Sequence, residues 1–150
     1  MRITDVTPDR GTLGRDLLAM QHAAYAVEAK LIEDDRIPPL HETLEDLCAE
    51  RLTWLGAFDD DRLAGAVAWS ETARTVDIDR LVVDPGMHRR GIGGALVREV
   101  MARAGDRRIV VSTGRANVPA RTLYERLGFG RVEDVEVIPG LWITRYAYPV

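Results

Sequence analysis

Apolar and polar residues alternate along the chain with two different periods, which separate the strands from the helices. Residues 1–7, 52–58, 63–70 and 76–83 are short, β-branched or alternating runs bounded by turn residues, as strands are. Over residues 13–32 the apolar positions recur every three or four residues, which predicts a long helix. Because short turns join the last three runs, the first half of the chain predicts a leading strand, a helical segment and an antiparallel meander.

The second half of the chain predicts a strand–helix–strand unit, a second helix and a closing hairpin. Helical spacing starts near Ala95, and a short buried strand follows at 108–113. A strand, a crossover helix and a strand imply parallel pairing with a right-handed connection. Asn117 is a good N-cap for the next helix, and 129–138 with 141–148 form the hairpin.

Together these elements predict the fold class and one way in which copies of the chain would associate. The acidic connector after the first helix contains Thr43-x-x-Asp46, which resembles a capping box opening a short helix. The whole pattern predicts one domain over residues 1–150, α/β (α+β), with a mixed, mostly antiparallel central sheet flanked by helices. The apolar last strand, 141–148, is expected to form a sheet edge that needs cover, which predicts a homodimer through that strand.

Composition narrows the class of protein further. A net charge of −4 argues against a general nucleic-acid binder, so a local group of arginines is expected to mark a local site. The lone cysteine, Cys48, excludes an internal disulfide and indicates a reducing compartment. No apolar run is long enough to span a membrane. We therefore expect a cytoplasmic protein with no nucleic-acid and no membrane partner.

A glycine-rich basic loop lies between the strand that ends at Val83 and the following helix. It consists of His88, Arg89, Arg90, Gly91, Ile92, Gly93 and Gly94. The first turn of a helix presents unpaired N–H groups and a partial positive charge, and glycine lets the backbone approach an anion closely. The loop therefore predicts a phosphate or pyrophosphate site, and the alternative is an ordinary connector with surface arginines.

Two other phosphate-binding motifs do not match this loop. A P-loop needs Lys followed by Ser or Thr after its last glycine, whereas Ala95 and Leu96 follow Gly94. A dinucleotide fingerprint that started at Gly91 would need glycine at position 96.

Two segments resemble the acetyl-CoA motifs of the GNAT N-acetyltransferase family. Leu81-Val82-Val83-Asp84-Pro85 followed by His88-Arg89-Arg90-Gly91-Ile92-Gly93 is similar to the family's strand and its Gln/Arg-x-x-Gly-x-Gly/Ala loop. His88 stands where Gln or Arg is usual, and Arg90 to Ala95 also fits, two residues later, so both registers stay open. The segment from Asn117 to Phe129 is similar to the family's Asn-x-x-Ala-x-x-Leu-Tyr-x-x-x-Gly-Phe.

The resemblance implies the acyl-CoA N-acyltransferase (GNAT) fold, and acetyl-CoA as co-substrate without a metal. It implies transfer of the acetyl group to a primary amine of a small molecule or peptide by direct attack. The cofactor would contact Leu81, Val82, Val83, the glycine loop (His88, Arg89, Arg90, Gly91, Ile92, Gly93, Gly94), Asn117 and Tyr124.

Two residues would carry the chemistry that the resemblance implies. Tyr124 would protonate the leaving thiolate, and Asp79, where relatives often have Glu, or else Asp77 would take the amine proton. The alternatives are that Tyr124 is a core residue, that Asn117 is only an N-cap, and that Asp79 is a solvated residue paired with Arg80 or Arg62.

Acceptor specificity is expected in the first two helices, their connector and the final hairpin. The polar residues available in the helices and connector are His22, Tyr25, Glu28, Glu33, Asp34, Asp35 and His41. The rival functional hypothesis is a non-catalytic acyl-CoA-binding module that senses acyl-CoA for a partner. Tyr124 argues against that hypothesis, because binding alone needs no acid beside the sulfur.

Overall fold

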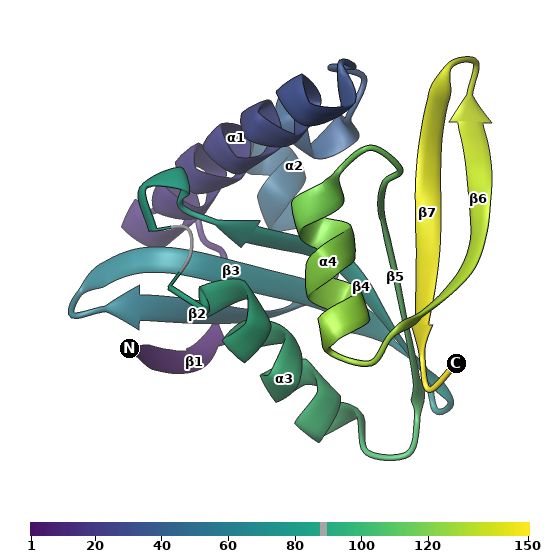
Figure 1. Ribbon diagram of the computed structural model, residues 1–150. Coiled ribbons are helices and arrows are strands. Elements are labelled where there is room, and N and C mark those ends of the chain that lie inside the picture. Colours follow the sequence, from purple (N-terminus) through teal and green to yellow (C-terminus); the bar gives the residue numbers. More distant parts are fainter. Residues whose placement is uncertain (88–89) are drawn as a thin grey trace.

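Seven strands form one sheet in the computed structural model, which describes residues 1–87 and 90–150 (Figure 1). The strands are β1 (Arg2–Val6), β2 (Thr53–Asp59), β3 (Arg62–Glu71), β4 (Thr75–Val83), β5 (Arg108–Gly114), β6 (Gly130–Ile138) and β7 (Leu141–Tyr148). The helices are α1 (Thr12–Ile32), α2 (Leu44–Ala49), α3 (Ile92–Ala104) and α4 (Val118–Arg126), with 3₁₀ turns η1 (Pro38–His41) and η2 (Pro85–Met87). None of the helices in this described part of the chain is both long enough and apolar enough to cross a membrane.

The strand order is β1-β2-β3-β4-β5-β7-β6, and only β4 and β5 pair in parallel. The predicted meander corresponds to β2, β3 and β4, and the predicted parallel pair to β4 and β5 with α3 as the crossover. Helices α1 and α2 cover one face of the sheet, and α3 and α4 cover the other (Figure 1). The predicted fold class is confirmed.

Local signals in the sequence fix where three helices begin. Thr43 and Asp46 form both hydrogen bonds of a capping box at the start of α2, as predicted. Asn117 caps α4, because its side chain accepts a hydrogen bond from the Ala120 N–H. Helix α3 starts at Ile92 rather than near Ala95. The N-cap of α3 is Gly91, whose φ of 72° lies in the left-handed region that favours glycine.

The prediction that the last strand forms a sheet edge is wrong. Strand β7 pairs with β5 on one side and with β6 on the other, so its apolar side chains belong to an interior strand. The edge at this end of the sheet is β6, whose pairing is interrupted by register shifts between Arg131 and Glu133 and between Glu136 and Ile138. Such bulges commonly protect an edge from pairing with another chain. The argument for a homodimer through β7 therefore loses its premise.

A β-bulge in β4 changes which face its side chains point to. Trp69 of β3 lies opposite Ile78, but Ala68 lies opposite Arg80, so Asp79 is an extra residue on β4. Before the bulge, Ile78 packs in the core under α3 and α4. After the bulge, Leu81 packs against that same core, whereas Val82 packs in the core under α1 and α2.

Candidate functional site

Strands β4 and β5 pair along only part of their length. Residues Thr75 to Ile78 lie opposite Arg108 to Val111, and beyond these positions no further pairing joins the two strands in the described residues. Strand β4 continues to Val83 and β5 to Gly114, and the two strands diverge (Figure 1). A cleft of about 260 Å³ lies where they separate.

Side chains from both faces of the sheet line this cleft. On the face of α3 and α4, the cleft is lined by Asn117, Ala120 and Tyr124. On the opposite face, helix α1 contributes Tyr25, Glu28 and Ile32, and the connector contributes Arg36 to Pro39. The hairpin adds Val137, Leu141 and Ile143 on that face. Asp79 to Leu81 and Val111 to Gly114 form its two strand walls. The cleft therefore passes between the strands and joins the two helical layers.

One edge of β4 faces this cleft. The opposite edge hydrogen-bonds β3 as far as Val83, which pairs with Gly65. Past Ile78 the edge towards β5 has no strand partner among the described residues. Main-chain groups on such an edge are strong donors and acceptors that a bound molecule with amide groups can pair with.

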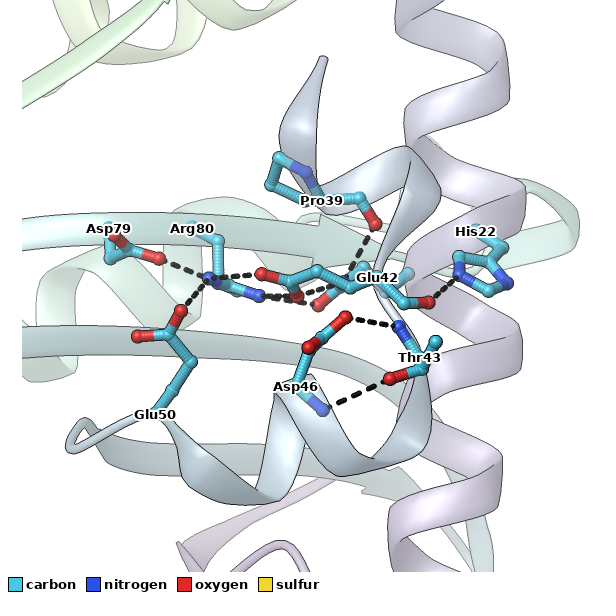
Figure 2. A network of polar contacts seen from close by, with 9 residues as sticks. His22, Pro39, Glu42, Thr43, Asp46, Glu50, Asp79 and Arg80 are labelled. Atoms are coloured by element: carbon cyan, nitrogen blue, oxygen red, sulfur yellow. Dashed lines mark hydrogen bonds and ion pairs between the residues drawn. The ribbon is translucent and has the colours of Figure 1, made fainter.

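A buried arginine anchors the bulge of β4 to the connector (Figure 2). Arg80 is 4% exposed, and its Nη1 donates to Glu42 Oε1 at 2.5 Å and to Gln21 Oε1 at 3.0 Å. Its Nε donates to Asp79 Oδ2 at 2.6 Å, and Gln21 Nε2 donates to Pro39 O at 2.9 Å. Burial lowers the pKa of Arg80, but the hydrogen bonds to Glu42 and Asp79 outweigh this effect and raise the pKa above its ordinary value. The network thus holds a permanent cation between β4, α1 and the connector.

Asp79 lines the cleft beside this network. Its side chain is 41% exposed and pairs with Arg80, one of the two partners that the sequence suggested. The other suggested partner, Arg62, instead pairs with Asp84 at 2.9 Å. Asp77 lies two residues earlier, and burial, with a further contribution from Asp79, raises the pKa of its carboxyl.

Tyr124 forms part of the cleft wall next to the aromatic core. It is 4% exposed, and its ring meets that of Phe129 edge-on with centroids 5.6 Å apart. No described side-chain polar atom is both sealed from solvent and without a hydrogen bond. The Tyr124 hydroxyl has no such bond to a described residue, so it is not sealed from solvent, and the residue lines the cleft. Burial, with a smaller effect of Glu28, raises the pKa of Tyr124 above its ordinary value, so the hydroxyl keeps its proton at neutral pH.

Glu28 and Tyr25 lie on the α1 side of the same cleft. Glu28 Oε1 accepts hydrogen bonds from the Gly114 N–H at 3.2 Å and the Thr113 hydroxyl at 3.4 Å. Burial raises the pKa of Tyr25, and the negative charge of Glu28 adds to the increase. Gly114 lets α1 come this close, because a Cβ at that position would lie 2.8 Å from Ile32 Cγ2.

The start of α3 lies on the other side of β4. Among the residues that the structure describes, no side chain caps its first turn, and no acidic residue lies in that turn. A Cβ on Gly93 would lie 3.4 Å from Leu123 Cδ2 and 3.7 Å from side-chain atoms of Leu81 and Val83. The backbone of this turn therefore faces the gap between β4 and α4, and its N–H groups form a site suited to an anion.

The structure separates the residues of the predicted cofactor loop. Gly91 is the N-cap of α3, Gly93 and Gly94 lie in its first turn, and the side chain of Ile92 is buried in the core. Arg90 Nη1 contacts Asp59 Oδ2 at 3.1 Å across the turn between β2 and β3. His88 and Arg89 lie outside the described residues.

The other predicted residues also fall into two groups. Asp79, Leu81, Asn117 and Tyr124 line the cleft together. The side chain of Val82 points to the opposite core, and Val83 packs beside α3, so these two could contribute only main-chain groups to a ligand in the cleft.

Sequence reasoning missed the wall formed by the end of β5, Val111 to Gly114, and the connector residue Arg36. The signal for β5 was available, because ligands commonly bind beyond the carboxyl ends of neighbouring parallel strands and the parallel pair was predicted. The ion pair of Arg36 with Asp34 is local, but its contact with Pro139 O joins residues 103 positions apart, which no local pattern indicates.

Comparisons with known proteins point to one family. The family model described as "Acetyltransferase (GNAT) family" matches residues 18–129. The UPF0157 protein YqkA of Bacillus subtilis is 35% identical over 140 residues, which are 92% of this chain and 41% of that protein. The chain thus spans less than half the length of this curated relative.

Solved structures share the fold at low sequence identity. The PaiA N-acetyltransferase of Thermoplasma acidophilum, solved in complex with coenzyme A, has a TM-score of 0.75 and 19% identity, with 98% of each chain covered. The ribosomal-protein-S18-alanine N-acetyltransferase of Escherichia coli has a TM-score of 0.73 and 16% identity, covering 97% of this chain and 92% of that one.

Tyr25 and Tyr124, the two tyrosines that line the cleft, predict how the free energy of unfolding depends on alkaline pH. In the unfolded chain they ionise near the ordinary value of 10.0, whereas in the folded protein their pKa values are raised. Above that pH the folded state binds more protons, so the free energy of unfolding should fall by up to about 1.4 kcal/mol per pH unit for each tyrosine. Urea unfolding from neutral to strongly alkaline pH measures this slope.

Tyr124→Phe should remove the part of that slope that Tyr124 contributes. A slope that is identical in the wild type and in Tyr124→Phe would contradict the assignment.

Proposed function

This chain belongs to the acetyltransferase (GNAT) family, and on that premise we propose that it transfers the acetyl group of acetyl-CoA to a primary amine by direct attack. The observation that carries the proposal is the cleft between β4 and β5. It brings the accessible hydroxyl of Tyr124, the open edge of β4 and the carboxylate of Asp79 to one place. The coenzyme A complex of the Thermoplasma protein, which has the same fold, supports this choice of co-substrate.

The residues present fit coenzyme A at both of its polar parts. The uncapped first turn of α3, with Gly93 and Gly94 and no acidic side chain, suits a pyrophosphate. The open edge of β4 at residues 81–83 presents main-chain groups that match the amides of a pantetheine arm. Asn117 lines the same cleft, and its side-chain oxygen caps α4, which leaves the amide NH₂ group to donate to that arm.

Bound acetyl-CoA would supply a thioester carbonyl as the electrophile. In the proposed reaction the nitrogen of a neutral amine forms a bond to the carbonyl carbon as the carbon–sulfur bond breaks. Asp79 accepts a proton from that nitrogen, and Tyr124 donates a proton to the departing sulfur. Both side chains then exchange protons with solvent through the cleft, so the net change is one proton moved from nitrogen to sulfur.

Tyr124 holds its proton at neutral pH, as an acid must until the sulfur leaves, and the raised pKa makes it a weak acid whose contribution to the rate is modest. A thiol ionises near pH 8.5, so a thiolate is a tolerable leaving group at neutral pH. Tyr124 therefore assists a step that would otherwise proceed more slowly.

Coenzyme A should raise the melting temperature of the protein, and Gly93→Val should abolish the rise. A ligand at 100 times its dissociation constant stabilises the folded state by about 2.7 kcal/mol. The valine methyls would occupy the gap between β4 and α4, where a Cβ already reaches contact distance. Differential scanning fluorimetry with and without coenzyme A measures the shift.

The matched control for this substitution is Ala102→Val, at an exposed position near the other end of α3. It should retain the full shift. Absence of any shift for the wild-type protein at saturating coenzyme A would refute the binding site.

Tyr124→Phe should lower kcat by at least about tenfold, or roughly 1.4 kcal/mol of barrier, with the affinity for coenzyme A nearly unchanged. The substitution keeps the ring and its packing against Phe129 and removes only the hydroxyl. Thiol release from acetyl-CoA across a panel of amines measures turnover.

The results separate the roles of Tyr124. If affinity collapses while turnover at saturation persists, the hydroxyl is a binding contact. If neither changes, Tyr124 is a packing residue. A wild-type protein that binds coenzyme A but releases no thiol with any amine would favour the acyl-CoA-sensing alternative.

A further inference from the structure

Two polar atoms on the α1 side of the cleft have no hydrogen-bond partner in the part of the chain that the structure describes. Both hydrogen bonds of the Glu28 carboxylate go to Oε1, and neither Glu28 Oε2 nor the Tyr25 hydroxyl is hydrogen-bonded to a described residue. No described polar side-chain atom of a buried or half-buried residue is sealed and unpartnered, so both atoms are accessible. Because both residues line the cleft, it presents a carboxylate oxygen and a hydroxyl to an incoming molecule.

The remaining walls on this side are largely apolar. They are formed by Ile32, Ile37, Pro38, Val137, Leu141 and Ile143. An anionic group at one end of an apolar enclosure suits a molecule with one cationic group and an apolar body.

A link between the connector and the last hairpin bounds this end of the cleft. Arg36 Nη2 donates to Pro139 O at 2.9 Å, and Asp34 holds the same guanidinium through Nε at 3.0 Å and Nη2 at 2.7 Å. Arg36 also lines the cleft, and a Cβ on Gly140 would lie 3.5 Å from its Nη2. The link therefore joins two segments that both line the cleft, so an extended peptide that entered between them would meet it.

The volume of the cleft also favours a small acceptor over a peptide. The whole cleft measures about 260 Å³, below the roughly 300–1,000 Å³ that is typical of sites for drug-sized ligands. It must also hold the thioester end of the co-substrate, so little space is left for the acceptor.

We propose that the acceptor is a small primary amine with an apolar body, and that Glu28 receives its ammonium group. This inference rests on the proposed function and names the substrate class of the same site. An ammonium group has three N–H donors, and Glu28 Oε2 and the Tyr25 hydroxyl accept from it. Most of the amine is charged at neutral pH, so a carboxylate at this position recognises its predominant form. One proton leaves to solvent before the nitrogen attacks.

The first experiment compares acceptors by kcat/KM in the thiol-release assay. The small apolar amines are 3-methylbutylamine and 2-phenylethylamine, and the comparison acceptors are spermidine and an unstructured peptide with a free N-terminus. Both small amines should exceed the peptide and spermidine by an order of magnitude or more. A preference for the peptide or for spermidine would overturn the inference while leaving the proposed acetyl transfer intact.

The second experiment tests Glu28 itself. Glu28→Gln keeps an oxygen that can accept from the Gly114 N–H, but it removes the negative charge. Hydrogen bonds to charged groups are the stronger kind, so KM for 2-phenylethylamine should rise roughly 10- to 100-fold with kcat little changed. Glu45→Gln removes a charge of the same sign at an exposed position of α2 outside the cleft, so both constants should stay at the wild-type values. An unchanged KM in Glu28→Gln would overturn the inference.

The third experiment removes the hydrogen bond between Arg36 and Pro139. Arg36→Ala removes the contact to Pro139 and should raise kcat/KM for the peptide relative to 2-phenylethylamine. An unchanged ratio would show that this link does not exclude peptides and would contradict that part of the inference.

A calorimetric measurement keeps the inference separate from the proposed function. If no amine is acetylated, the proposed function fails, and binding of 2-phenylethylamine in the presence of coenzyme A then decides the inference. Binding that weakens roughly 10- to 100-fold in Glu28→Gln supports it. Absence of binding to the wild-type protein overturns it.

Discussion

The separation of β4 from β5 beyond Ile78 and Val111 is the constraint on which the rest of the structure depends. Two parallel strands that paired along their full length would leave no opening between the helical layers. Here the pairing stops, the extra residue Asp79 bends β4, and side chains from both faces of the sheet line the space that results. The same divergence exposes an edge of β4 to a ligand. The cleft is thus a consequence of sheet topology.

The Arg80 network lies beside this divergence, and it satisfies the polar side chains that are buried there. A buried guanidinium is costly unless it is paired and hydrogen-bonded, and Glu42, Asp79 and Gln21 provide those partners. Because Glu42 belongs to the connector between the first two helices, the network also fixes that connector against the bulge of β4 (Figure 2). The group proposed as base and the segment proposed to bound the acceptor are therefore held by the same cation.

The sequence was most informative where the determining interactions are local. The capping box at Thr43 and the N-cap at Asn117 involve residues three positions apart, and both are present. The position of β7 depends on whether the hairpin adds to β5 by its first or its second strand, which no local pattern specifies. Its apolar composition is explained by pairing on both sides. Local sequence does not indicate the bulge at Asp79 either, because it is defined only by the register of β4 against β3. Nor does it indicate the contact of Glu28 with Gly114, which lies 86 residues away.

Hydrogen exchange of backbone amides with and without coenzyme A tests most directly whether the separation of β4 and β5 forms the binding site of the co-substrate. The account predicts added protection at Leu81 and Val83, whose N–H groups point to the open edge of β4, and at Ile92 to Gly94 in the first turn of α3. Strand β6, at the sheet edge, should exchange at the same rate in both states. Protection confined to other segments, or no change at residues 81–83, would contradict the account.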